Sequence, residues 1–262
     1  MIPKIIHYVW LGGAPKPKLV LECIDSWRRM CPGWEIREWG DDFARSVENR
    51  YVREALAHRK WAFAADWIRL HALAGAGGFY LDTDMEMMKP LDPFLGEKFV
   101  ISWERISGKT NFNCGVIGCE PGSEIVRELL GVYEDLPFVK ADGELDLTPN
   151  TERLLAYAKE RWGVQAKDGT DTVRFADGCV IYPCTHFLPK DGYTYHHYSA
   201  SWLDAWARKV WLKAGPYKLV RFKRRLEADP SSKPVPMCGE RIIWTMPLNK
   251  RKRIALTKQE MR

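Results

Sequence analysis

Two aspartates, Asp82 and Asp84, stand one residue apart directly after a short apolar segment at residues 79–81. Carboxylate oxygens are hard ligands that suit Mg²⁺ or Mn²⁺, and such ions commonly share their coordination with a substrate diphosphate. The triplet therefore indicates a divalent-cation site for a phosphate-bearing substrate. Because aspartate is also a favoured turn residue, a strand followed by an acidic turn explains the triplet equally well.

The segment that must position this triplet begins as a helix at Ala62, is broken by glycines at 75, 77 and 78, and continues as a short strand. Apolar residues near a 3.6-residue period mark one helix face, and Asp66 and Arg69, three residues apart, share another. Side chains at the carboxyl end of an interior strand project into the crevice where α/β proteins bind ligands. The pattern predicts that both carboxylates emerge into such a crevice.

Other segments supply the rest of an α/β fold. An apolar, β-branched run at residues 2–11 predicts a buried first strand of a parallel sheet, and an amphipathic helix follows. The sequence predicts helices at 19–30, 121–136 and 150–161, and strands at 34–39, 99–103 and 180–182.

The combination A-x-D-x-x-R followed by G-G-x-Y-x-D-x-D strongly resembles nucleotide-sugar glycosyltransferases that carry the Asp-x-Asp (DXD) sugar-binding region. That group includes the yeast initiating mannosyltransferase, bacterial capsular polysaccharide transferases and, more distantly, the clostridial glucosylating toxins. The resemblance implies a GT-A type fold, with a mostly parallel central sheet flanked by helices. The matching residues here are Asp66, Arg69, Gly77, Gly78, Tyr80, Asp82 and Asp84.

The resemblance also implies roles for residues that bind the donor. The opening pattern P-K-x-I-H-x-x-W-x-G makes Trp10 a candidate for stacking on the nucleotide base. Asp66 and Tyr80 would hold the ribose and the sugar or diphosphate, and Arg69 would add a fixed positive charge or orient Asp66 and Asp82. In related transferases an asparagine two residues before a glycine touches the donor sugar, which suggests Asn113, although Asn113 and Gly115 fit a simple turn equally well.

Residues 193–202, Y-T-Y-H-H-Y-S-A-S-W, resemble the closing motif of the same family, His-His-aromatic-x-x-Ser-Trp. This implies that His196 supplies a further metal ligand and that Ser201 and Trp202 contact the diphosphate. His197 is the alternative ligand, because neighbouring residues on a strand face opposite ways and only one should reach the metal.

The implied activity is metal-dependent, retaining transfer of a sugar from a nucleoside-diphosphate sugar, with UDP favoured, to a glycan or lipid-linked acceptor in surface or capsular polysaccharide synthesis. Mn²⁺ or Mg²⁺ held by Asp84 and His196, with Asp82 helping, would offset the charge that builds on the leaving diphosphate. Asp82 and Asp84 are thus the expected catalytic residues, and front-face attack on the sugar is favoured over a covalent intermediate.

Composition divides the 262-residue chain in two. Residues 203–262 hold 16 Lys and Arg against 5 Asp and Glu, while residues 1–202 hold 24 against 29. We expect a catalytic domain at 1–202 and a basic, Trp-rich helical extension at 203–262. Aromatic and basic residues together are typical of segments that lie on anionic lipid, although a helix that packs its tryptophans on the catalytic domain fits as well.

The chain contains no run of 18 apolar residues, so we expect no membrane-spanning helix. Its seven cysteines show no metal-binding spacing and predict reduced thiols in a cytoplasmic protein, peripheral on the inner membrane face if the basic extension binds lipid.

Two rival functions remain. In a phosphohydrolase, Asp82 would be the nucleophile and Asp84 the acid/base, but that chemistry usually places the triplet after the first strand. Alternatively, the basic extension itself is the function, as a membrane- or nucleic-acid-binding protein. It carries no recognisable nucleic-acid-binding motif, so we expect no nucleic acid among the partners.

Overall fold

The computed structural model describes residues 1–106, 109–165, 171–198, 206–214, 217–224, 240–249 and 252–259. The chain divides into two compact units, Met1–His197 and Tyr198–Arg262. Among the described residues, no helix is both long enough and apolar enough to span a membrane.

The first unit is built on a seven-stranded sheet with the order β2-β1-β3-β6-β5-β8-β7. The pairings of β2, β1, β3, β5 and β8 give these five strands one direction, while β6 and β7 run against them. This is the mostly parallel sheet that the sequence predicts. The strands are β1 Ile5–Val9, β2 Glu35–Trp39, β3 Gly78–Leu81, β5 Phe99–Ile106, β6 Lys109–Cys119, β7 Val173–Arg174 and β8 Cys179–Tyr182.

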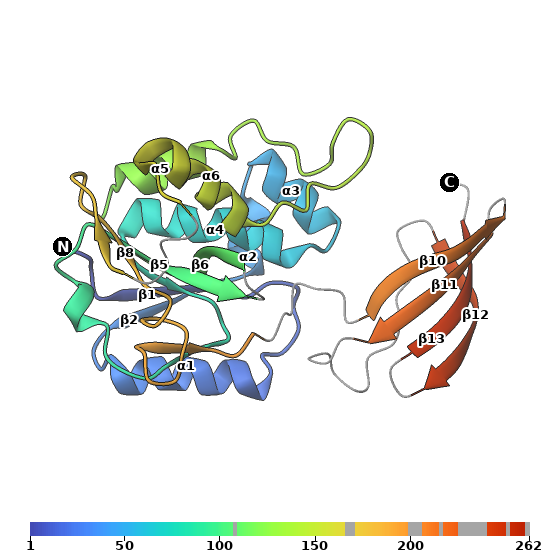
Figure 1. The fold of residues 1–262 in the computed structure, drawn as a ribbon, viewed down its shortest axis with the longest axis horizontal. Coiled ribbons are helices and arrows are strands. Elements are labelled where there is room, and N and C mark those ends of the chain that lie inside the picture. The colour runs from blue at the N-terminus through green and yellow to red at the C-terminus, as the bar shows by residue number, and fades with distance from the viewer. Residues whose placement is uncertain are drawn as a thin grey trace. The chain divides into compact units, whose positions relative to one another are not determined.

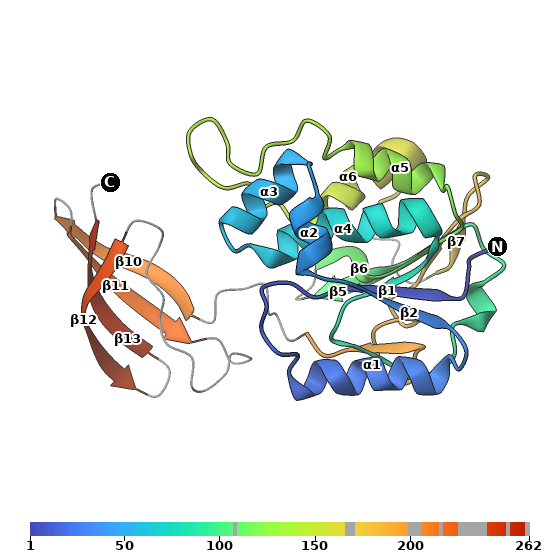
Figure 2. The same ribbon diagram turned by 180° about the vertical axis from the view of Figure 1, so that it is seen from behind.

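Helices cover both faces of this sheet. Figures 1 and 2 show α3, α4, α5 and α6 on one face and α1 on the other. The helices are α1 Lys18–Met30, α2 Asp41–Ser46, α3 Arg50–Ala57, α4 Trp61–Ala76, the short 3₁₀ helix η1 Asp92–Phe94, α5 Glu124–Gly131 and α6 Asn150–Trp162.

Two hydrophobic cores lie on the two sides of the sheet because successive strand residues point to opposite faces. On β5, Ile101 and Trp103 pack in the core with Ile68 of α4, while Val100 packs in the other core with Trp27 of α1. A small two-stranded sheet, β4 Met85–Met87 with β9 Thr194–His196, joins the α1 side. There the indole of Trp27 donates a hydrogen bond to the carbonyl of Met85.

The glycine break between α4 and β3 is sterically required. Gly77 and Gly78 have φ of +66° and +97°, a region that side chains disfavour. A Cβ at Gly78 would lie 2.7 Å from the carbonyl oxygen of Ile5, and one at Gly77 would lie 2.6 Å from the nitrogen of Pro121. Helix α4 can therefore end directly at a central strand, which brings Asp82 to the end of β3.

The prediction of a helical C-terminal extension is wrong. The described residues of the second unit form a four-stranded antiparallel sheet in the order β10-β11-β13-β12: β10 Trp206–Ala214, β11 Tyr217–Arg224, β12 Glu240–Asn249 and β13 Lys252–Gln259. The β10–β11 register shifts between Val210 and Leu212. One extra residue there interrupts the two-residue alternation, so the apolar spacing of this segment imitates a helical period.

Candidate functional site

The two aspartates follow β3 in a tight turn. The amide of Asp82 donates to the carbonyl of Gly115 on the neighbouring strand β6, at 2.9 Å, and the amide of Met85 donates to the carbonyl of Asp82, at 3.0 Å. This turn leads the chain from the central sheet into β4. The Asp82 side chain is 30% exposed and that of Asp84 is 12% exposed. Asp82 therefore gives the pair access to solvent.

The pairing of β4 with β9 brings His196 to the same place. Met85 stands opposite His196 in this antiparallel pair, and the next amide, of His197, donates to the carbonyl of Asp84 at 3.1 Å. The Nε2 atom of His196 lies 3.4 Å from Oδ1 of Asp84. One ligand atom from each of Asp82, Asp84 and His196 lies within 4.8 Å of the others.

His197 faces away from this cluster. Its Nε2 atom lies 2.9 Å from Oε2 of Glu86, the middle residue of β4. The two adjacent histidines therefore contact different carboxylates, as expected for neighbours along an extended chain.

This ligand set fits a divalent cation. Two carboxylates and one imidazole are a donor set that Mn²⁺ accepts readily, and Mg²⁺ could use the same carboxylates while retaining several waters. Burial lowers the pKa of His196, but the neighbouring carboxylates of Asp84 and Glu104 and the charge of Asp82 outweigh burial and raise the pKa to about 10. Without a cation, the cluster thus balances its carboxylates with a protonated imidazole.

Glu104 is a buried carboxylate beside the cluster. It lies on β5, is 8% exposed, and its Oε1 atom is 3.6 Å from Nδ1 of His196. It follows the fully buried Trp103 by one position, so strand alternation turns it to the opposite face of the sheet, the face on which β4 and β9 lie.

Arg69 occupies the other side of Asp82. Its Nη2 atom lies 2.9 Å from Oδ1 of Asp66, and its Nη1 atom lies 3.4 Å from Oδ1 of Asp82 and donates to the carbonyl of Cys114 at 2.6 Å. The guanidinium stands over the ring of Tyr80 at 4.4 Å from the ring centre. Arg69 is 6% exposed, so it provides a nearly fully buried positive charge next to Asp82.

Tyr80 contacts the site through Asp82. Its side chain is almost fully buried, and its hydroxyl donates to Oδ1 of Asp82 at 2.9 Å. Burial raises the pKa of Tyr80 well above its usual value, so the hydroxyl stays protonated and remains a donor. Tyr80 and Arg69 together hold one oxygen of Asp82.

Asp66 is held from two sides. Besides Arg69 on Oδ1, the backbone amide of Asn150, at the start of α6, donates to Oδ2 at 3.2 Å. Burial raises the pKa of Asp66 to about 6, against the lowering influence of Arg69. Each carboxylate oxygen keeps a second lone pair with which it could accept a hydrogen bond from a ligand.

Asn113 lies inside the sheet next to the aspartates. It is 1% exposed, and its Oδ1 atom accepts from the amide of Gly115 at 3.0 Å. A Cβ at Gly115 would lie 3.0 Å from Oδ2 of Asp82 and 3.1 Å from Oδ1 of Asn113. The glycine thus lets β6 approach Asp82 closely, which gives this Asn-x-Gly segment a steric role whether or not Asn113 touches a ligand.

Trp10 lies at the end of β1, in a loop that is held from α2. The indole of Trp10 donates to the carbonyl of Ala14 at 2.8 Å. The carboxylate of Asp41 accepts from the amides of Gly12 and Gly13, at 2.8 and 2.9 Å.

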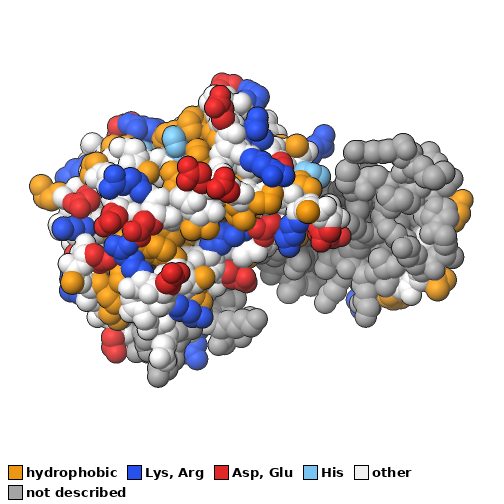
Figure 3. All heavy atoms as spheres, turned by 90° about the horizontal axis from the view of Figure 1, so that it is seen from above, with side chains coloured by type: hydrophobic (Ala, Val, Ile, Leu, Met, Phe, Trp, Pro, Cys, Tyr) orange, Lys and Arg blue, Asp and Glu red, His pale blue; other side chains and the backbone are white. Residues whose placement is uncertain are grey.

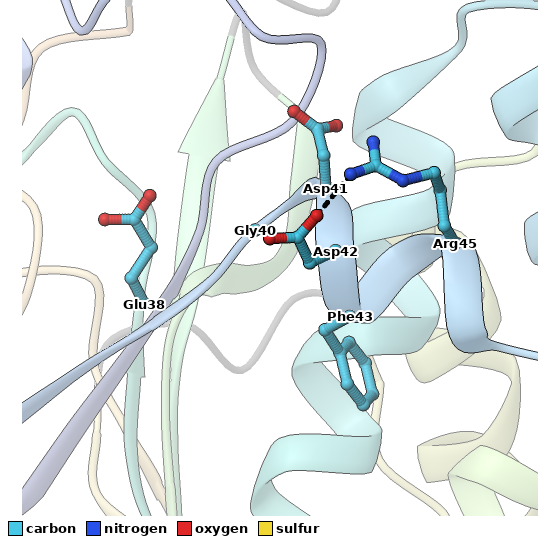
Figure 4. A pocket seen from close by; sticks show the side chains of 6 residues that line it. All are labelled: Glu38, Gly40, Asp41, Asp42, Phe43 and Arg45. Atoms are coloured by element: carbon cyan, nitrogen blue, oxygen red, sulfur yellow. Dashed lines mark hydrogen bonds and ion pairs between the residues drawn. The ribbon is translucent and has the colours of Figure 1, made fainter.

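A surface hollow borders this loop (Figure 4), and Asp42 and Arg45 form an ion pair within it. It is lined by Glu38, Gly40, Asp41, Asp42, Phe43 and Arg45.

The structure brings most of the predicted residues together. Asp66, Arg69, Tyr80, Asp82, Asp84 and His196 form one connected network, and Asn113 adjoins it through Gly115. Ser201 and Trp202, predicted as diphosphate contacts, lie outside the described residues.

Three contacts were beyond sequence reasoning: the Asn150 amide on Asp66, the Cys114 carbonyl on Arg69, and the Asp41 clamp on the loop of Trp10. The first two contacts are made by backbone groups, whose position no residue type reveals. Aspartate at position 41 is already explained as a helix cap, so the sequence gives no reason to expect its contact with the loop.

Comparison with known proteins gives consistent results. Residues 17–100 match the family model described as "Glycosyltransferase sugar-binding region containing DXD motif". An uncharacterized glycosyltransferase, L373, of Acanthamoeba polyphaga mimivirus is 25% identical over 222 residues, covering 77% of this chain and 84% of the relative. Inositol phosphoceramide mannosyltransferase 3 of Schizosaccharomyces pombe is 29% identical over 143 residues, covering 52% of this chain and 37% of the relative.

Among solved structures, the PaToxG glycosyltransferase aligns with a TM-score of 0.45 and 19% identity, over 63% of this chain and 72% of that one. The family match spans Asp66, Arg69, Tyr80 and both aspartates of the triplet, whereas Trp10 and His196 lie outside it. The chain is thus similar to glycosyltransferases, and its residues 17–100 match their DXD sugar-binding region.

Proposed function

We propose that this enzyme transfers a hexosyl group from a nucleoside-diphosphate sugar to a hydroxyl of a glycan or lipid-linked acceptor, with retention of anomeric configuration and with a bound divalent cation. The observation that carries the proposal is the convergence of Asp82, Asp84 and His196 from two paired strands. A UDP-sugar is the first candidate donor, and GDP-mannose is the competing one because one relative is named a mannosyltransferase.

Asp84, His196 and Asp82 would hold Mn²⁺ or Mg²⁺. The cation would neutralise negative charge that builds on the diphosphate as the glycosidic bond breaks. Arg69 acts on the same charge indirectly, because it fixes one oxygen of Asp82 from a buried position. Tyr80 fixes the same oxygen through its hydroxyl. Asp82 thereby keeps its second oxygen, Oδ2, for the cation or for a bound water.

Trp10 would stack on the nucleotide base, and Asp66 would accept a hydrogen bond from the ribose. Trp10 stands at the carboxyl end of β1 and Asp82 at that of β3, and the two strands are parallel neighbours in the sheet. The carboxyl edge of adjacent parallel strands is where α/β sheets bind nucleotides. Ser201 and Trp202 remain proposed diphosphate contacts, and Asn113 a proposed sugar contact.

The way the carboxylates are engaged supports retention through front-face attack. Asp84 and Glu104 contact His196, and Asp82 contacts Arg69 and Tyr80. A covalent intermediate requires a carboxylate that is free to attack the sugar. Trapping of a glycosyl-enzyme adduct would overturn the front-face mechanism, and NMR of the product anomer would test retention.

The second unit would bring the enzyme to an anionic membrane surface that carries the lipid-linked acceptor of a surface or capsular glycan. Its sequence from residue 203 holds 16 basic and 5 acidic residues. Its described strands expose large apolar side chains, some of which are visible in Figure 3. These are Trp211, Leu212, Tyr217, Ile243, Trp244, Met246 and Leu248. Basic charge beside exposed tryptophan suits the interface of an anionic bilayer.

Vesicle co-sedimentation of the full chain tests this part of the proposal. Binding to vesicles with phosphatidylserine but not to neutral ones is expected, and Trp244→Ser with Met246→Ser should weaken it. If the protein binds neither vesicle type but binds single- or double-stranded nucleic acid with steep salt dependence, the result would support the nucleic-acid alternative instead. The described cysteines are free thiols, in keeping with a proposed location on the cytoplasmic side.

A panel of UDP- and GDP-sugars with Mn²⁺, read by donor hydrolysis and by thermal shift, tests the activity itself. One donor should both stabilise the protein and be hydrolysed slowly in the absence of acceptor. Release of phosphate from a simple phosphomonoester, with no response to any nucleotide sugar, would favour a phosphohydrolase with Asp82 as nucleophile.

A further inference from the structure

The imidazole of His196 stands between two carboxylates that come from different parts of the sheet. Its Nε2 atom lies 3.4 Å from Asp84, and its Nδ1 atom lies 3.6 Å from Oε1 of Glu104. The side chains are buried to a similar degree, with 14% of His196 and 11% of Glu104 exposed. The ring thus has one nitrogen toward the candidate cation site and the other toward Glu104.

This arrangement bears on how the imidazole can bind a cation. A neutral imidazole carries its proton on one nitrogen and offers a lone pair on the other. His196 can bind through Nε2 only when the proton sits on Nδ1, and a carboxylate that accepts from Nδ1–H selects that form and holds the ring orientation. Glu104 is the carboxylate at that nitrogen.

The position of Glu104 is rigidly defined. In the β5–β6 pair Glu104 stands opposite Asn111, and two positions along β5 Ser102 stands opposite Asn113. The residue between them, Trp103, is fully buried and stacks on Phe112 at 4.4 Å between ring centres. Packing of that indole in the opposite core keeps the Glu104 side chain on the face where β9 lies.

We propose that Glu104 is a positioning residue that accepts the Nδ1 proton of His196 and thereby presents Nε2 to the divalent cation shared with Asp82 and Asp84. This inference rests on the proposed function, because it assumes that the three residues hold a cation. Glu104 itself touches neither the donor nor the cation. Its effect is on the affinity of the site and on the order of the His196 ring.

The test compares Glu104→Leu and Glu104→Gln with Glu86→Leu in the 262-residue chain. Glu86 is a matched control, because it places a carboxylate 2.9 Å from the neighbouring His197 and its loss removes the same charge. Calorimetry should show Mn²⁺ affinity reduced about 10- to 100-fold in Glu104→Leu. Glu104→Gln keeps an acceptor oxygen and should recover most of that loss, and Glu86→Leu should bind as the wild type does.

A second readout needs no cation. If Glu104 accepts the Nδ1 proton of His196 as proposed, that proton should resonate far downfield in the NMR spectrum of the cation-free wild-type protein. That signal should vanish in Glu104→Leu and persist in Glu86→Leu. Circular dichroism checks that each variant is folded. If Glu104→Leu does not fold, the Mn²⁺ affinity and the Nδ1 signal of Glu104→Gln test the positioning role instead.

The outcomes distinguish the positioning role of Glu104 from the proposed metal dependence. Unchanged Mn²⁺ affinity and an unchanged Nδ1 signal in Glu104→Leu would overturn the positioning role. A loss in Glu104→Gln as large as that in Asp84→Asn would also overturn it, because Glu104 would then be a direct ligand. If the wild-type protein binds no Mn²⁺ while the Nδ1 signal still depends on Glu104, the proposed metal dependence fails and the contact between Glu104 and His196 stands.

Discussion

Asp84 and His196 approach to 3.4 Å across the pairing of β4 with β9, two three-residue strands from distant parts of the chain. The contact depends on the register of this pair, because a shift of one residue would exchange His196 for His197. That neighbour already contacts Glu86, so the correct register gives each histidine its own carboxylate. The small sheet therefore completes the candidate ligand set that the central sheet begins.

Asp84→Asn should lower sugar transfer at least about 100-fold, because it removes a charged ligand from the centre that we propose stabilises the leaving diphosphate. Initial rates with saturating donor and Mn²⁺ measure the loss. Asp25→Asn, at an exposed pair with Arg28, is the control for the same chemical change and should leave the rate unaltered. EDTA should abolish wild-type activity and Mn²⁺ should restore it; an EDTA-resistant rate would contradict the account.

Arg69→Met should destabilise the fold by about 3–5 kcal/mol. The substitution leaves the carboxylates of Asp66 and Asp82, which are buried or partly buried, without the guanidinium that pairs with them. Urea unfolding followed by circular dichroism measures the change. Arg45→Met removes a similar guanidinium from an exposed pair with Asp42 and should leave the midpoint unchanged. Equal effects of the two substitutions would show that the Arg69 network is not structural.

Gly115→Ala should reduce activity while leaving most of the fold intact. The new methyl would lie 3.0 Å from Oδ2 of Asp82, so the carboxylate must shift away from the proposed cation position. Gly75→Ala adds the same methyl in α4, where nothing lies within 4 Å, and should be neutral or slightly stabilising. Donor turnover and Mn²⁺ affinity measured together should fall for the first variant; a fully active Gly115→Ala enzyme would contradict the close approach.

Asp41→Ala should weaken donor binding without disturbing Mn²⁺ binding. The Asp41 carboxylate holds the amides of Gly12 and Gly13 and so fixes the loop that carries Trp10. We expect the KM for the donor to rise by about 3- to 10-fold for the loss of such charge-assisted hydrogen bonds, with kcat nearly constant. Asp42→Ala, one residue along the same helix, is the matched control. A fall in kcat at constant KM would argue against a role for this loop in base binding.

The pH dependence of stability should carry a contribution from Asp66. Burial raises its pKa to about 6, so the carboxyl binds its proton more tightly in the folded protein than in the unfolded chain, where the value is near 3.8. Its contribution to the free energy of unfolding is therefore fully present below about pH 4 and is lost as the pH rises through about 6, by an amount on the order of 3 kcal/mol.

Urea unfolding at several pH values in EDTA tests this sign. Between about pH 4 and pH 7, the decline in unfolding free energy should be shallower in Asp66→Asn than in the wild type. Parallel curves for the two proteins would show that Asp66 does not titrate in this range.

The central part of the fold was predictable because local and long-range signals agree there. One continuous segment holds the helix that carries Asp66 and Arg69, then the glycine break, then the strand that ends at Asp82. The order of these elements along the chain is enough to predict that they are neighbours in space. The contact with His196 required the resemblance to known transferases, since no spacing rule joins residues so far apart in sequence.

The second unit was not predictable in the same way. The register shift at Val210 and Leu212 breaks the alternation that marks a strand, and basic residues interleaved with tryptophan satisfy a helical pattern as well as an extended one. Glu104 shows a different limit. Its position at the end of a predicted strand indicates a direction but not a partner, and only the β4–β9 pairing shows that His196 stands there.

The most direct test of the account is a crystal structure of the 262-residue chain grown with Mn²⁺ and UDP, with anomalous scattering used to locate manganese. The account predicts one manganese peak in contact with Asp84, His196 and the diphosphate, with Asp82 bound directly or through one water. A structure in which UDP is bound and the manganese lies elsewhere, with Asp84 and His196 contacting only each other, would contradict it.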